Sequence, residues 1–360
     1  MINKEFFKNA EELAVARGID VEEVYAIFEK ALINSFKKMY GNTSCRVVIN
    51  PAKNEILLYS VHKVVEAYTP AGAEIDPEAP EEMLLEDAKK IKSSYKVGDI
   101  VEQQVNIKNF SRTTIGAAKS VTNQGIRTAE REKAYQYFKD LEDEMISGEV
   151  SNVGEKFIVV SLGYNVTSAL PISELLPNDH FQIGDTIRVY IKKVEQTTKE
   201  PKVQISRTDR QLVTRLMENY IPEIKSGIIE IKGIARDPGD RSKIALYSND
   251  PKVDAIGSCV GESGIRIREI VNALGGEKVD LYKWSEDPEE LISNSLQPAN
   301  VTKVLSIDPK EKSSVVVVPD EHLSLAIGKA GQNVRLAVQS CGWKIDIMPT
   351  SEAFEKDLLI

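Results

Sequence analysis

The sequence predicts a multidomain α+β protein: an N-terminal domain of helices and strands, then a small five-stranded β-barrel, then two copies of one α/β unit. Three observations predict this order. They are a helical stripe of apolar residues near the N-terminus, five short apolar runs in the middle and a tandem repeat in the last third. The length of 360 residues agrees, because single cores rarely grow beyond about 250 residues.

Composition and charge exclude several classes of protein. The formal net charge of −9 argues against a protein that coats nucleic acid non-specifically, although it permits local basic faces. Three cysteines and three histidines lie scattered without metal-ligand spacing, so we expect a reducing compartment, no disulfide scaffold and no metal site. We find no signal peptide and no run of about 18 apolar residues, which predicts a cytoplasmic protein without membrane contact.

Residues 1–125 are predicted to form the N-terminal α/β domain. Apolar side chains from Tyr25 to Met39 recur at helical spacing. A proline-rich, acidic stretch between Glu66 and Glu82 is expected to be a loop. The expected strands are 47–49, 56–65 and 100–107.

A long polar helix is predicted from about residue 114 to residue 144. Gly125 lies inside it and costs about 1 kcal/mol relative to alanine, so a break there is one possibility. The helix is expected to act as a semi-rigid spacer, with residues 126–144 as the linker.

Residues 145–207 contain five short apolar runs separated by glycine-containing turns, which is the strand count of an OB-fold. In the fourth run Ile187, Val189 and Ile191 alternate with polar neighbours, so one face should fill the barrel. The other face would offer cations and an aromatic ring to single-stranded RNA, with an ordinary solvated face as the alternative. The candidate RNA-binding residues of the barrel are Phe157, Arg188, Tyr190 and Lys192. The cations Arg207, Arg210 and Arg215 follow and either extend a basic track or are solvated helix charges.

The last third contains one unit twice. The segment Val260 to Arg268 matches Ile327 to Arg335, with first glycines 67 residues apart at positions 261 and 328. The match continues through Leu274-Gly275 and Cys341-Gly342 to a short strand of the form apolar-Asp-apolar. A lone G-x-x-G occurs by chance, but two copies in the same context do not.

This context is the KH pattern, in which a G-x-x-G loop joins two helices. Missing Cβ atoms let an RNA backbone approach, and the N–H groups of the second helix favour phosphates. Such a loop holds about four nucleotides beside an apolar groove. The alternative is a tight helix–helix turn with no ligand. The candidate RNA-binding residues are Gly261, Glu262, Ser263, Gly264, Ile265, Arg266 and Arg268 in the first copy, and Gly328, Lys329, Ala330, Gly331, Gln332, Asn333 and Arg335 in the second.

The order of these parts resembles the NusA family of bacterial transcription factors. The resemblance is carried by Gln204-Ile205-Ser206-Arg207-Thr208, by the stretch from Ala235 to Ala245 and by Gly257-Ser258-Cys259-Val260-Gly261, and it extends over essentially the whole chain. It implies an S1-type barrel at 145–207 and type II KH domains at 208–298 and 299–360.

The resemblance also implies a function. It implies a monomer without cofactor or catalytic residues that binds core RNA polymerase, nascent single-stranded RNA and other Nus antitermination factors. Such a protein would modulate pausing, intrinsic termination and antitermination. Residues 1–140 are then expected to bind polymerase but not RNA, and residues 141–360 the reverse.

Two residues depart from the family pattern. Glu262 puts a negative charge inside the first loop, and Pro171 stands where many S1 domains carry histidine. We expect no acidic C-terminal repeats and hence no autoinhibition of that kind.

Two rival functions remain from the residues alone. A polynucleotide phosphorylase-like exonuclease also carries KH and S1 domains, but it needs catalytic domains for which we find no motif. A ribosome-associated KH protein is the second rival, and co-purification with polymerase or with ribosomal subunits would separate the two.

Substitutions in the loops carry further expectations. Gly328→Asp should abolish RNA binding while leaving melting nearly unchanged, and Gly264→Asp should act similarly but more weakly. Glu262 either repels phosphate or pairs with Arg266 four residues on. Glu262→Gln separates these possibilities.

Overall fold

The computed structural model describes residues 4–41, 44–69, 79–106, 110 and 112–358. The chain divides into two compact units, Met1–Gln136 and Tyr137–Ile360. None of the described helices is long and apolar enough to cross a membrane. Within the same residues, no group of three or more His, Cys, Asp or Glu side chains is placed to hold a metal ion.

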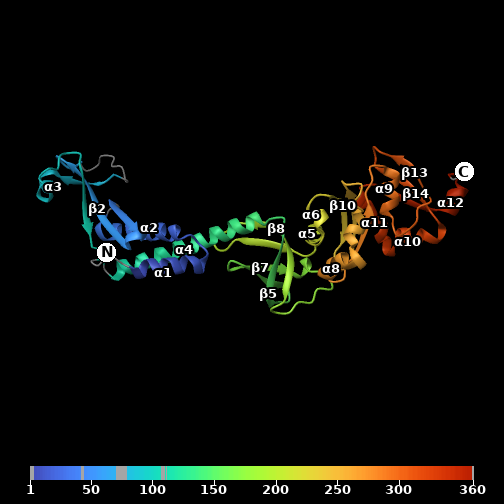
Figure 1. Ribbon diagram of the computed structural model, residues 1–360, viewed down its shortest axis with the longest axis horizontal. Coiled ribbons are helices and arrows are strands. Elements are labelled where there is room, and N and C mark those ends of the chain that lie inside the picture. The colour runs from blue at the N-terminus through green and yellow to red at the C-terminus, as the bar shows by residue number, and fades with distance from the viewer. Residues whose placement is uncertain (1–3, 42–43, 70–78, 107–109, 111, 359–360) are drawn as a thin grey trace. The chain divides into compact units, whose positions relative to one another are not determined.

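The first unit packs helices on a four-stranded sheet (Figure 1). Strand β2 is central: it pairs antiparallel with β1 and β4 and parallel with β3. The elements are α1 (Lys4–Arg17), α2 (Val21–Tyr40), β1 (Cys45–Asn50), β2 (Glu55–Val65), β3 (Glu81–Leu84), α3 (Leu85–Ile91), β4 (Ile100–Val105) and α4 (Arg112–Asp140). The helical stripe and the three expected strands are confirmed. The acidic stretch was expected to be loop as far as Glu82, but Glu81 and Glu82 begin β3; residues 70–78 lie outside the described residues.

Helix α4 is continuous through Gly125, so no break occurs there. A Cβ atom at Gly125 would lie 2.5 Å from Cγ2 of Ile27, which shows that the glycine permits close packing against α2. Ile126 and Ala129 are buried in the core of the first unit. The start of the expected linker, residues 126–129, therefore belongs to the N-terminal core, and the helix ends at Asp140 and not at residue 144.

The second unit begins with the barrel, whose five strands follow the order β7-β6-β5-β8-β9. All four ladders are antiparallel, and the Ser168 hydroxyl donates to the Val203 carbonyl at 2.6 Å between the two end strands. The five-stranded barrel predicted from the sequence is confirmed. The strands are β5 (Met145–Val153), β6 (Phe157–Gly163), β7 (Val166–Pro171), β8 (Thr186–Glu195) and β9 (Lys202–Ser206).

Two α/β units with the same topology follow. In each, an antiparallel strand pair leads into two short helices and a third strand that pairs parallel with the second. The first contains α5 (Arg210–Tyr220), α6 (Pro222–Lys225), β10 (Ile229–Asp237), β11 (Arg241–Ser248), α7 (Ala255–Val260), α8 (Ile265–Ala273) and β12 (Lys278–Lys283). The second contains α9 (Pro288–Ser295), β13 (Lys303–Asp308), β14 (Ser313–Val318), α10 (Leu323–Ile327), α11 (Gln332–Cys341), β15 (Lys344–Pro349) and α12 (Thr350–Glu355). The predicted duplication is confirmed in the backbone.

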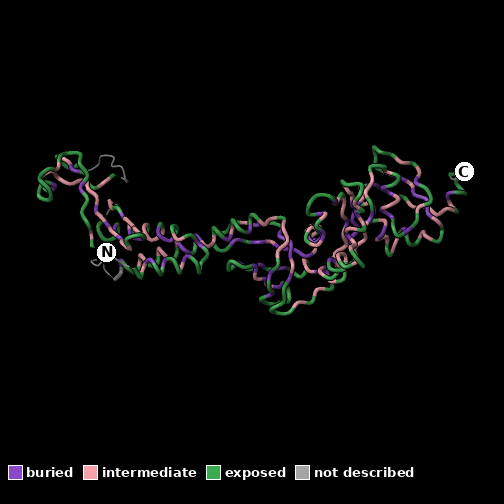
Figure 2. Tube along the Cα trace, in the orientation of Figure 1, coloured by how far each residue is buried: buried purple, intermediate pink, exposed green. Residues whose placement is uncertain are grey.

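Shared cores join the barrel and both repeats. Leu176 and Tyr190 of the barrel region pack with buried residues of α5, β11 and α8. Ala245 and Tyr282 of the first repeat pack with Trp343 and other buried residues of the second. Figure 2 shows buried stretches running through these sheets. These shared cores fix the positions of the two repeats relative to the barrel.

Candidate nucleic-acid interface

Loop 1 (Gly261 to Gly264) and loop 2 (Gly328 to Gly331) have the same backbone conformation. The first glycine has φ/ψ of 73°/176° in loop 1 and 75°/171° in loop 2, and the last has 74°/20° and 74°/14°. Ser263 and Ala330, at the third position, also adopt positive φ, 52° and 51°. The φ/ψ of the first glycine is essentially restricted to glycine, so the backbone requires it, whereas the left-handed angles at the third and fourth positions only favour glycine.

The two glycines of a loop have different surroundings. A Cβ atom at Gly328 would lie 2.7 Å from the backbone nitrogen of Asn333, and one at Gly261 would lie 2.8 Å from Cγ of Arg266. A Cβ atom at Gly331 would meet nothing within 4 Å. The first glycine therefore permits a tight turn between the two helices, which is the role that the alternative interpretation gave to both glycines. The last glycine of loop 2, Gly331, leaves open space beside the loop. The geometry argues against the expectation that Gly328→Asp leaves melting nearly unchanged, because the new side chain would strike the backbone of α11.

Both loops present exposed side chains together with apolar ones. Glu262, Ser263, Lys329 and Ala330 are all exposed. The loops are flanked by large apolar side chains that remain open to solvent, namely Ile265, Leu325 and Ile327. Exposed apolar side chains beside a positive-φ loop are what a nucleobase next to a bound phosphate would contact.

Beside loop 1 lies a groove of about 570 Å³. Ile256, Val260 and Ile267 line its helical side, and Val279 and Leu281 line its strand side. Arg241 and Asp280 also line it and form an ion pair, with Nε 2.6 Å from Oδ2. The groove is large enough for a nucleobase and combines apolar walls with polar groups.

Arg266 does not pair with Glu262. Its guanidinium donates to both carboxylate oxygens of Glu223, at 3.1 and 2.9 Å, and to the Ser258 carbonyl at 2.8 Å. The backbone N–H of Glu223 and the Arg266 guanidinium hold the pKa of Glu223 below its usual value. Arg268 donates to the Ser263 carbonyl at 3.1 Å, which braces loop 1. The proposed Glu262–Arg266 pair is therefore wrong, and Arg266 holds α8 against α6.

Three predicted RNA contacts of the second repeat instead face the first repeat. Gln332 donates to Asp237 and Asp240, at 3.0 and 2.7 Å, and Arg335 lies 2.6 Å from Asp237. Asn333 is buried, so its predicted contact with RNA is wrong. Periodicity could not show this, because these partners are more than 90 residues away in the sequence.

The buried partner of Asn333 is Lys243, a lysine inside strand β11. Its ammonium donates to the Asn333 Oδ1 at 2.6 Å and to the carbonyls of Ser295 and Gln297 at 2.7 and 2.8 Å. Burial lowers its pKa to about 8. Lys243 was not among the residues predicted from the sequence, because it directly precedes the apolar run Ile244-Ala245-Leu246 and follows the polar pair Arg241-Ser242, so no local pattern indicates its burial.

The barrel face differs from its prediction at two positions. Tyr190 is only 5% exposed and donates its hydroxyl to Asp143 at 2.7 Å; burial and Asp143 raise its pKa. Arg188 is half-buried and lies over the Tyr220 ring at 5.4 Å. The predicted open face is thus covered at Tyr190, whereas Arg188 is only partly covered by Tyr220 of α5. Phe157 stays 45% exposed, and Lys192 is exposed beside Glu174 at 3.2 Å.

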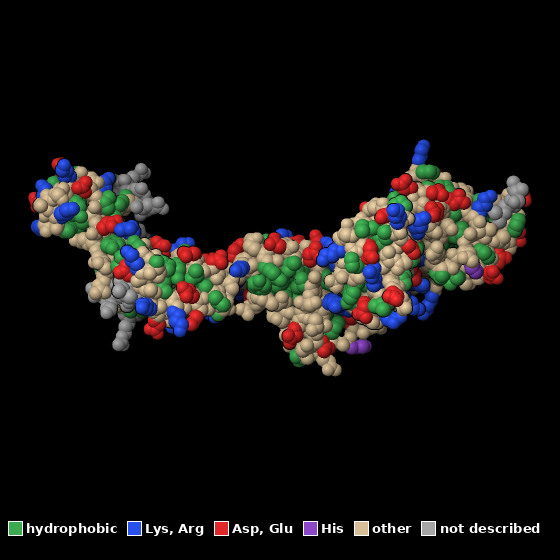
Figure 3. Space-filling model, in the orientation of Figure 1, with side chains coloured by type: hydrophobic (Ala, Val, Ile, Leu, Met, Phe, Trp, Pro, Cys, Tyr) green, Lys and Arg blue, Asp and Glu red, His purple; other side chains and the backbone are tan. Residues whose placement is uncertain are grey.

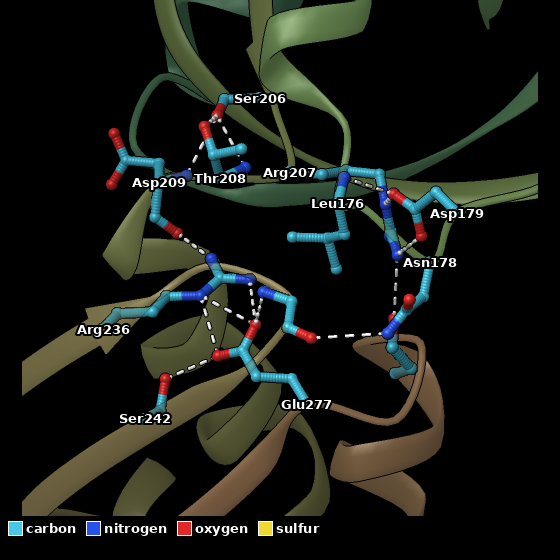
Figure 4. A network of polar contacts seen from close by, with 12 residues as sticks. Leu176, Asn178, Asp179, Ser206, Arg207, Thr208, Asp209, Arg236, Ser242 and Glu277 are labelled. Atoms are coloured by element: carbon cyan, nitrogen blue, oxygen red, sulfur yellow. Dashed lines mark hydrogen bonds and ion pairs between the residues drawn. The ribbon is translucent and has the colours of Figure 1, made fainter. Parts of the chain in front are cut away.

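Two buried ion pairs lie where the barrel meets the first repeat (Figure 4). Arg207 forms two bonds to Asp179, at 2.6 and 2.8 Å, and donates to the Ala273 carbonyl at the end of α8 at 3.2 Å. Arg236 pairs with Glu277 at 2.8 Å and also donates to the Asp209 carbonyl. Arg207 is therefore not part of an exposed basic track. It holds the C-terminal end of the helix whose N-terminus is loop 1.

The surface charges near these loops are mixed. On the face of the second unit that Figure 3 shows, Lys and Arg side chains intermingle with Asp and Glu. Among the described residues, neither Glu262 nor Lys329 forms an ion pair. Lys329 is thus a cation of loop 2 that stays available to a phosphate, whereas the face shown in Figure 3 carries no uniform basic patch.

Comparison with known proteins assigns a family to each of four consecutive segments. Residues 5–132 match the NusA N-terminal domain, and residues 139–206 match the S1 RNA binding domain. Residues 207–284 match the NusA-like first KH domain, and residues 288–355 match the NusA-like second KH domain.

Three relatives that match nearly the whole chain carry the same name. The transcription termination/antitermination protein NusA of Halalkalibacterium halodurans is 43% identical over 359 residues, which cover 99% of this chain and 91% of the relative. The protein of that name from Bacillus subtilis is 42% identical, covering 94% of this chain and 89% of the relative. The one from Thermus thermophilus is 37% identical, covering 96% and 89%.

Proposed function

The chain belongs to the NusA family of transcription termination/antitermination proteins, and we propose that it holds nascent single-stranded RNA on its S1 barrel and two KH loops. The observation that carries this proposal is the shared backbone of loops 1 and 2, with positive φ at three of four positions in each. Loop 2 opens onto free space at Gly331, loop 1 has only the Arg268 guanidinium beside Gly264, at 4.0 Å, and both loops are flanked by exposed apolar side chains. This combination suits a phosphate with a base beside it.

We further propose that the first unit binds core RNA polymerase. Membership in the family supports this role, and the first unit has its own core, separate from those that support the RNA loops. In this arrangement the chain acts as a monomer, joins other Nus factors in antitermination complexes and works in the cytoplasm. Binding both polymerase and the emerging RNA would let it modulate pausing, intrinsic termination and antitermination.

The chain acts in this proposal as a binding protein and not as an enzyme. The four matched segments are an N-terminal domain and three RNA-binding domains. Incubation with labelled RNA and phosphate should release no nucleoside diphosphates, and phosphorolysis would favour the exonuclease alternative.

A transcription assay tests the function directly. Core polymerase is halted at a hairpin-dependent pause, and the full chain is added in wild-type form or with Ser263→Asp and Ala330→Asp together. The wild type should lengthen the pause and raise termination at an intrinsic terminator, and the double variant should do so much less. A chain with Ser263→Asn and Ala330→Asn controls for shape without added charge. Equal activity of the Asp and wild-type chains would contradict the proposal.

A further inference from the structure

A second cavity, of about 420 Å³, lies between the barrel and the first repeat. It is lined from the barrel side by Asn178, His180, Phe181 and Arg188, and from the end of α8 by Asn272. Arg207 and Asp179, the buried pair described above, also line it. The cavity therefore combines a phenyl ring, an imidazole ring, two amides, one carboxylate and two guanidinium groups.

The charges in this cavity do not cancel. Asp179 neutralises Arg207, whose remaining N–H groups donate to the carbonyls of Arg188 and Ala273. Arg188 has no carboxylate partner among the described residues; its guanidinium donates to the Tyr220 hydroxyl and lies over that ring. A half-buried cation without a carboxylate favours an anion, and here it is held in place by Tyr220.

The ring of Phe181 is also held in place. The Arg207 guanidinium lies 5.3 Å from its centroid, and Arg207 itself is fixed by Asp179. An aromatic ring accepts any nucleobase by stacking, and the neighbouring amides of Asn178 and Asn272 offer donors and acceptors to a base edge. A cavity of this size and lining fits one nucleotide.

We propose that this cavity binds one nucleotide of the RNA strand held by loop 1, with its phosphate on Arg188 and its base against Phe181. The inference rests on the RNA-binding function proposed above. Helix α8 connects loop 1 with the cavity. It begins after Gly264 and ends at Ala273, a length of about 14 Å at 1.5 Å per residue. The strand would thus extend from loop 1 toward the barrel.

The test compares two RNAs on the full chain by fluorescence anisotropy. An RNA of about four nucleotides occupies a KH loop alone, and one of about 16 nucleotides can reach the cavity as well. Arg188→Gln keeps the backbone carbonyl that accepts from Arg207 and removes only the cation. It should weaken the longer RNA about tenfold and reduce the slope of log affinity against log salt by about 0.7, with the shorter RNA unchanged. Lys202→Gln, at an exposed position of β9, removes the same charge outside the cavity and should change neither affinity.

The ring is tested separately. Phe181→Leu should weaken the longer RNA about tenfold, and Phe181→Tyr should keep wild-type affinity because stacking is retained. Wild-type affinity and salt slope in Arg188→Gln would overturn the cavity proposal, and so would an equal loss for the shorter and the longer RNA. A wild-type chain that binds neither RNA would overturn the proposed function and the cavity with it.

Discussion

Glu262 places a carboxylate inside loop 1, where loop 2 has Lys329 at the same position. Because Arg266 is engaged by Glu223, this carboxylate has no cation to hold in place. Its remaining effect is repulsion of the phosphate, which salt weakens. The loops should therefore differ in affinity, with loop 2 the stronger.

We predict that Glu262→Gln tightens RNA binding about two- to fivefold at low salt and less at high salt. Titrations of labelled RNA at two salt concentrations measure this. Glu269→Gln removes an equal charge at an exposed position of α8 outside the loop and serves as the control. A weaker complex for Glu262→Gln at low salt would show that the carboxylate contributes favourably.

The third position of each loop gives a cleaner test than its glycines. Ala330 is exposed with φ of 51°, a region that Asp and Asn tolerate better than other residues. Ala330→Asp should weaken RNA binding about tenfold by adding a charge, whereas Ala330→Asn should bind nearly as the wild type does. Both variants should melt at the wild-type temperature.

Gly328→Asp should behave differently from Ala330→Asp. The new side chain would meet the backbone of Asn333 and hold an unfavourable φ, so we expect a loss of about 1–3 kcal/mol of stability. Thermal unfolding distinguishes the two variants. An unchanged melting temperature for Gly328→Asp would mean that α11 moves aside without strain.

At the scale of elements, Lys243 of β11 holds the second repeat through α11 and the end of α9. Its pKa of about 8 in the folded chain lies below the ordinary 10.5, so the folded state loses the proton first as pH rises. The unfolded state then binds more protons between these values, and the free energy of unfolding should rise with pH across that window.

We predict that this rise is on the order of 2 kcal/mol between about pH 7.5 and about pH 9.5 and is missing in Lys243→Met. Urea unfolding of the second unit at about pH 7.5 and about pH 9.5 measures the difference between the two chains. Lys303→Met, at an exposed lysine of β13, should keep the wild-type rise. The same pH dependence in all three chains would contradict the role assigned to Lys243.

Local patterns predicted the elements well, and distant contacts explain the errors. The barrel strands and both loops follow from alternation, glycine spacing and turn residues, which act over a few positions. The partners of Gln332, Arg335 and Asn333 lie on the first repeat, so no pattern in the neighbouring sequence indicates these contacts. The buried Tyr190 was misjudged because alternation shows which side chains share a face, but not what covers that face.

At the scale of the whole molecule, the two proposed tasks, polymerase binding and RNA binding, fall on separate units of the chain. The first unit has its own core, including residues of α4 beyond position 125. The barrel and the two repeats share cores, and the buried Arg207 links the barrel to α8 of the first repeat, so their RNA-contacting groups are expected to act together. Changes in the loops should therefore leave the first unit, and whatever it binds, unaffected.

The most direct test is a pair of titrations of the full chain carrying Ser263→Asp and Ala330→Asp, one with labelled RNA and one with core RNA polymerase. We predict a loss of RNA affinity of at least about tenfold, with polymerase affinity and melting temperature unchanged. The matched Asn variants should resemble the wild type in both titrations. Undiminished RNA affinity in the folded Asp variant would contradict the proposal that the two loops hold the RNA.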